Sequence, residues 1–61
     1  MEKNYRITIF TTENVIEKDY YYKETAFGTI MAYRERMDDF KAGILSEKIE
    51  GKWITICSIV K

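Results

Sequence analysis

The chain has 61 residues, with ten basic and ten acidic side chains and therefore no formal net charge at pH 7. Aromatic residues make up 15% of it, which excludes intrinsic disorder, a state typical of chains with few aromatic residues and a large net charge. This length predicts a single compact α+β domain over residues 1–61. Because a domain of this size has a small core, we expect self-association to add to its stability.

The N-terminal third of the chain predicts a β-hairpin over residues 4–22. In the opening segment YRITIFTT, apolar residues alternate with polar ones, as they do in a strand with two different faces. Residues 11–14 are typical of a turn. The segment VIEKDYYY, residues 15–22, is predicted to be the second strand, because aromatic side chains lose rotamer freedom on a helix. The alternative makes this segment a loop and gives a βαββ fold.

From Thr25 to Lys41 the apolar residues follow the period of an amphipathic helix. At ~100° per residue, one arc of this helix collects its large apolar side chains and one alanine: Ala26, Phe27, Ile30, Met31, Tyr33, Met37 and Phe40. We predict that Thr25 caps the N-terminus and that Gly43 follows the C-terminus. Small residues, Gly28 and Ala32 among them, lie on the opposite side.

The C-terminal segment predicts a second hairpin, with strands at 44–49 and 53–60 and a turn at Glu50–Gly51. Both faces of the last strand are apolar, with Ile54, Ile56 and Val60 on one and Trp53, Cys57 and Ile59 on the other. This pattern is typical of a central strand that is covered on both sides. One helix covers only one side of a sheet, so the other side needs a cover from outside the chain.

The predicted fold is therefore α+β, a ββαββ domain with a mostly antiparallel sheet and one amphipathic helix packed on one face. We expect the helix to cover Ile7, Ile9, Ile54, Ile56 and Val60. We expect the open face to present the remaining large apolar side chains, Phe10, Trp53, Cys57 and Ile59, beside Arg6, Thr8 and Thr55.

Side chains that carry chemistry are scarce. The chain has no His, and Cys57 is its single cysteine, so it has neither an internal disulfide nor the usual ligands of zinc. The thiol lacks a histidine base for nucleophilic catalysis. The three glycines are isolated and form no phosphate-binding loop. We expect no catalytic residues, no metal and no cofactor, and hence a protein that is not an enzyme.

We predict a small protein-interaction module that forms a homodimer or binds another protein through the open sheet face or the helix. The interaction residues predicted are Phe10, Trp53, Ile59 and Arg6 on the sheet, and Gly28 and Ala32 on the helix. Tyr, Trp, Phe, Met and Arg are the residues enriched in interface cores. The alternative is a nucleic-acid-binding accessory protein, in which Arg6, Lys52 and Trp53 form a basic and aromatic cluster.

No segment is apolar over the roughly 20 residues that a membrane span needs, and the N-terminus lacks the apolar core of a secretory signal. With one free cysteine, these features predict a cytoplasmic protein without a membrane partner. Small, neutral, aromatic-rich domains of this kind resemble accessory proteins of bacteria and phages.

Overall fold

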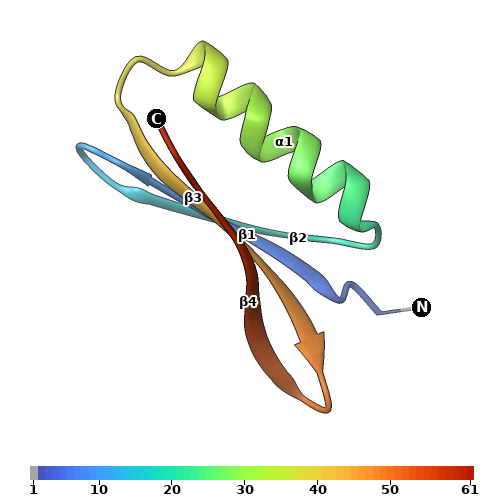
Figure 1. Cartoon of the computed structure of the whole chain (residues 1–61). Helices are drawn as coiled ribbons and strands as arrows, with labels where there is room; N and C mark the ends of the chain where they lie inside the picture. Colours follow the sequence, from blue (N-terminus) through green and yellow to red (C-terminus); the bar gives the residue numbers. More distant parts are fainter. Residues whose placement is uncertain (1) are drawn as a thin grey trace.

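The computed structural model describes residues 2–61, and within them it contains four strands and one helix (Figure 1). The elements in chain order are β1 (Tyr5–Thr11), β2 (Val15–Tyr20), α1 (Lys23–Arg36), β3 (Phe40–Ile49) and β4 (Lys52–Val60). The predicted ββαββ order is confirmed. The βαββ alternative is wrong, because residues 15–20 form a strand that pairs along its length with β1.

The four strands form one sheet in the order β2-β1-β3-β4, and each neighbouring pair is antiparallel. Both pairs of consecutive strands are hairpins, and the contact between β1 and β3 joins them. At the second turn, Glu50 and Gly51 have φ values of 51° and 80°. Two successive residues with positive φ are typical of the tight turn whose twist matches that of the strands.

Helix α1 packs on one face of the sheet, over β3, β1 and β2 (Figure 1). The core lies between these layers and consists of six side chains that are at most 2% exposed: Ile7, Ile9, Ala26, Ile30, Phe40 and Leu45. Ile7 and Ile9 come from the alternating strand pattern, and Ala26 and Ile30 lie one helical turn apart. The apolar residues predicted from the strand alternation and from the helical period therefore pack together in one core.

The helix is shorter than predicted at its C-terminus. It begins at Lys23, with Tyr22 as the N-cap residue, and Thr25 lies inside the first turn and accepts a bond from the Thr29 hydroxyl instead of capping. It ends at Arg36, because Phe40 already belongs to β3. Within residues 2–61 no helix has the length and apolar character that a membrane crossing needs.

Gly43 lies within β3 and does not end the helix, so its predicted role as a stop residue is wrong. A β-carbon on Gly43 would come within 2.6 Å of Cγ2 of Ile30 and 3.2 Å of Cδ1 of Ile9. The glycine therefore lets the helix approach the sheet closely. Its function is one of packing.

The prediction of which side chains of β4 face the helix is correct for the residues before Ile56 and wrong for the residues after it. β3 pairs Ser46 with Thr55 but Leu45 with Cys57, so a β-bulge in β4 adds one residue, Ile56. The bulge inverts the alternation that follows it. Cys57 and Ile59 consequently pack against the core, whereas Val60 lies on the open face, the reverse of the prediction.

The last strand is not central in the single chain, although two apolar faces are typical of a central strand. β4 lies at the edge of the sheet, where its partner among residues 2–61 is β3. The apolar character of both its faces is thus not explained by the fold of one copy.

Candidate protein-interaction surface

The side of the sheet that faces away from α1, called the open face below, carries a row of apolar side chains. Strand register aligns Phe10 of β1 with Val15 of β2 on one side and Ala42 of β3 on the other, and Ala42 with Val60 of β4. We call these four residues the apolar row. Its two ends are the most exposed parts, with Val15 58% and Val60 69% exposed. Both valines lie on edge strands, where no strand among residues 2–61 pairs with their outer side.

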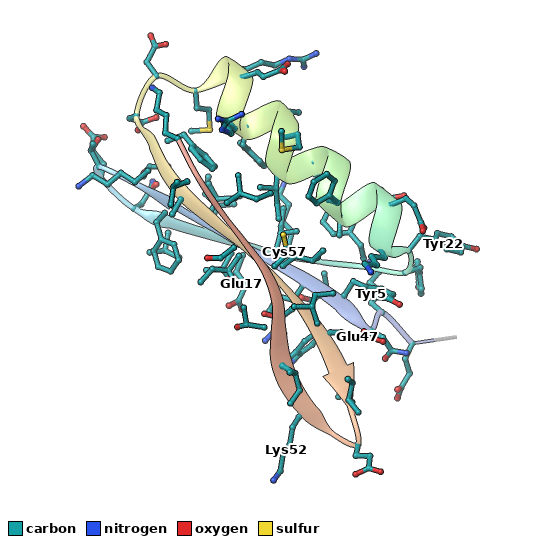
Figure 2. All side chains as sticks on the ribbon, in the orientation of Figure 1. Tyr5, Glu17, Tyr22, Glu47, Lys52 and Cys57 are labelled. Carbon is teal, nitrogen blue, oxygen red and sulfur yellow. The ribbon has the colours of Figure 1, made fainter. Side chains whose placement is uncertain are left out.

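A cluster of charged and aromatic side chains lies on the same face, toward the other end of β1. The Arg6 guanidinium donates two hydrogen bonds to the Asp19 carboxylate, at 2.7 and 3.1 Å, and lies 3.7 Å from a Glu17 oxygen. Its carbon Cζ stands 4.1 Å from the centre of the Trp53 ring. The Lys48 ammonium lies 6.0 Å from the same ring. In Figure 2, Glu17 lies on the side of the sheet away from α1.

The ion pair fixes Arg6 in place. Two parallel N–H···O bonds to one carboxylate hold a guanidinium in a defined plane, and the Trp53 ring supports it from one side. The hydrogen bond from Arg6 is the main reason that the pKa of Asp19 is lowered, and the same bond raises the pKa of Arg6. A rigid arginine beside a half-buried tryptophan is a combination found at the energetic centres of protein interfaces.

The lowered pKa of Asp19 predicts a pH-dependent contribution to folding. Because the folded-state pKa lies below the unfolded value of about 3.9, this contribution is present above that value and is lost as the pH falls through the folded pKa. We expect Asp19→Asn to lower the urea midpoint at pH 6. The difference from the wild type should shrink well below pH 4, where both proteins carry a neutral side chain at position 19. An equal difference at both pH values contradicts this account.

Three of the predicted sheet residues lie on one face. Arg6 and Trp53 are in contact, and Phe10 lies on the same face two register rows from Arg6. Ile59 is a correction, because it pairs with Gly43 and packs against the core beneath α1. Figure 2 shows Cys57, two residues earlier, with its sulfur on the helix side as well.

The two predicted helix residues do not join this surface. Gly28 lies in the open: beyond its chain neighbours and the backbone of its own helix, no atom of residues 2–61 lies within 4 Å of the place where a β-carbon would be. Ala32 lines a shallow hollow of about 250 Å³ on the helix surface, with Thr29, Tyr33, Arg36 and Met37. The residues of this hollow all come from the C-terminal part of α1 and its C-cap residue, and no second element contributes to it. The surface of the helix is therefore a weaker candidate for partner binding than the open face.

The basic cluster predicted for nucleic-acid binding has a different composition in the structure. Lys52 and Trp53 are neighbours in β4, so their side chains lie on opposite faces of the sheet. Figure 2 shows Lys52 at the far tip of the β3–β4 hairpin. Lys48 is the lysine beside the ring. The charge of Arg6 is already matched by Asp19, with Glu17 close by.

Sequence reasoning missed Val15, Val60 and Ile56 as surface residues. Val15 was visible as an apolar residue on a mostly polar strand, and its pairing with Phe10 follows from the hairpin register. Val60 and Ile56 depend on the bulge in β4, and the alternating pattern carried no signal for it. Predicting the apolar row therefore requires the register of all four strands.

Comparison of the chain with models of protein families, with curated proteins and with solved structures finds no match. Among residues 2–61 no three His, Cys, Asp or Glu side chains gather in a way that would hold a metal ion.

Proposed function

We propose that this protein is a non-enzymatic protein-interaction module and that its open face binds a protein partner. The observation that carries the proposal is the apolar row, which crosses all four strands in register and is most exposed at its two ends. Since the two valines are 58% and 69% exposed, each adds roughly 1–2 kcal/mol to binding if a partner buries the rest of its surface. The proposal includes a cytoplasmic location, which the free thiol of Cys57 favours.

The Arg6–Trp53 pair gives the surface a second, polar anchor. Interfaces place apolar side chains at their centre and polar groups at the rim, and arginine and tryptophan are over-represented among their energetic anchors. On the open face, the apolar row and the Arg6–Trp53 pair are separated by the register row that holds Thr8 and Ile44. A partner that covers both therefore contacts an apolar strip and a fixed cation.

The charges of the open face favour a protein over a nucleic acid. Nucleic-acid binding depends on unpaired positive charge, since phosphate neutralisation supplies most of the affinity. Here Arg6 is bonded to Asp19, and Glu17 lies beside it. Phosphate groups would meet these carboxylates as well as Lys48, so the face offers them little net attraction.

We expect Val15→Lys to separate the two possibilities. A lysine at this 58% exposed edge position should change the free energy of unfolding by no more than about 0.5 kcal/mol. It removes an apolar contact from a protein interface and should weaken partner binding at least about tenfold. It adds a cation to the face, so a nucleic-acid binder would gain affinity instead.

The measurement is capture from an extract of the source cells on immobilised wild type, Val15→Lys and a helix-surface control, Ala32→Lys. A partner should bind the wild type and the control and be lost with Val15→Lys. Loss with Ala32→Lys instead would move the binding surface to the helix. Tighter binding of a mixed-sequence oligonucleotide by Val15→Lys would overturn the proposal in favour of nucleic acid.

A further inference from the structure

The outer edge of β4 has few of the features that keep sheet edges from pairing. Such edges usually carry lysines or prolines or are covered by another segment. Residues 53–60 contain no charged residue and no proline, so the lysines at 52 and 61 lie beyond this stretch. Among residues 2–61 no strand pairs with this side of β4. The strand is therefore open to a further strand over most of its length.

Apolar side chains flank this edge on both faces. On the helix side, Ile54 is 46% exposed, because α1 lies over the other three strands. The Nε of Arg34 donates to the Val60 carbonyl at 3.0 Å, so this stripe of the helix faces β4. Phe27 lies two turns earlier on the same stripe and is 41% exposed. On the open face, Val60 is exposed too, and Ile56 at the bulge is 37% exposed.

The backbone groups that face outward follow from the hydrogen bonds to β3. The Lys61 N–H donates to the Lys41 carbonyl, so Lys61 faces β3, and by alternation Val60 and Ser58 face outward. At the other end, Ile49 and Lys52 close the two-residue turn and face each other. By the same alternation Trp53 and Thr55 face outward. Outward-facing groups thus lie on both sides of the bulge at Ile56.

We propose that a second copy of this chain binds along β4, with the two β4 strands antiparallel about a two-fold axis at the bulge. In this register Thr55 lies opposite Ser58 of the second copy, so outward backbone groups meet each other. Ile54 then lies opposite Ile59 on the helix side, and Trp53 opposite Val60 on the open face. Each of these three pairs joins residues of the same face, and both bulges fall at the centre.

The same strand is therefore its own complement, which argues for a second copy rather than an unrelated peptide. No charged pair forms within residues 53–60, and the lysines at 52 and 61 lie at the ends. The Val60 carbonyl keeps a free lone pair beside its bond to Arg34. In the dimer β4 becomes a central strand, the position that its two apolar faces predict.

The area buried between the two copies bears on the affinity of the dimer. A strand of nine residues is about 30 Å long and a sheet about 10 Å thick, so each copy contributes roughly 300 Å² before side chains such as Phe27 are added. This area belongs to the small, reversible class of interfaces. We therefore expect a dimer that dissociates on dilution.

Ser58→Pro tests this contact without removing a bond to β3. The Ser58 N–H faces outward, so proline should leave the single copy folded, as prolines do on edge strands. It removes two intermolecular hydrogen bonds by symmetry, and we expect dimerisation to weaken about tenfold or more. Ser58→Ala, which keeps the N–H, is the matched control and should dimerise like the wild type.

A second readout covers the case in which Ser58→Pro fails to fold. The Ser58 amide proton of the wild type should exchange with solvent more slowly as protein concentration rises, because pairing shields it. Exchange that does not depend on concentration overturns the proposal, as does a Ser58→Pro variant that dimerises as tightly as the wild type. Val15→Lys should leave this dimer unchanged, so its failure and that of the open-face proposal are separate results.

Discussion

Replacing Phe40 with alanine is expected to leave a large part of the protein unfolded at 25 °C. The Phe40 side chain is 2% exposed and is the largest fully buried side chain in the core. A Phe→Ala change at such a site costs about 3–5 kcal/mol. A chain of 61 residues has about 3–9 kcal/mol of stability in total, at roughly 0.05–0.15 kcal/mol per residue.

Urea unfolding followed by circular dichroism measures this loss, at low protein concentration so that association does not contribute. The control is Tyr22→Ala, since Tyr22 is an aromatic residue that is 60% exposed and whose side chain makes no cap bond. We expect the control to lie within about 0.5 kcal/mol of the wild type. Similar losses for the two variants would mean that Phe40 does not hold the layers together.

The second large effect is a coupling between Gly43 and Ile30. An alanine at position 43 places its β-carbon 2.6 Å from Cγ2 of Ile30, a branched side chain with little freedom to move. We expect Gly43→Ala to cost about 1–3 kcal/mol through overpacking. Ile30→Ala alone should cost about 2–5 kcal/mol, because it opens a cavity at the same place.

The double variant should be more stable than the sum of the two losses predicts. The methyl group of alanine 43 occupies space that the shortened residue at position 30 leaves free, so the two changes compensate in part. Urea unfolding of the four proteins gives the coupling energy, and strict additivity contradicts the close approach. Gly28→Ala is the control, and it should stabilise by about 0.5–1 kcal/mol, because that glycine lies in an open helix position.

The hairpins and the helix could be predicted because each depends on a local period. Alternation along β1 and the helical spacing of Ala26 and Ile30 both report which side of an element is buried. The helix end was misjudged because Phe40 fits either the helical arc or the start of β3. Phe40 belongs to β3 because it pairs with Thr11, and this contact joins residues that are distant in the sequence.

The faces of β4 could not be predicted beyond Ile56. A bulge changes the alternation by one residue, and nothing in the segment WITICSIV marks its place. Arg6, Trp53 and Phe10 were placed on the open face correctly, since none of them lies after the bulge. Strand order is likewise a property of the whole chain, so the edge position of β4 emerged only with the structure.

The most direct test of the self-association proposed along β4 is the mass of the protein in solution, measured by sedimentation over a wide range of concentration. We predict that the 7.3 kDa chain sediments as a dimer at high concentration and as a monomer on dilution. Val15→Lys should follow the wild type, and Ser58→Pro should need a concentration at least about tenfold higher to form the dimer. A wild type that stays at 7.3 kDa throughout would contradict self-association and leave the apolar faces of β4 without a cover.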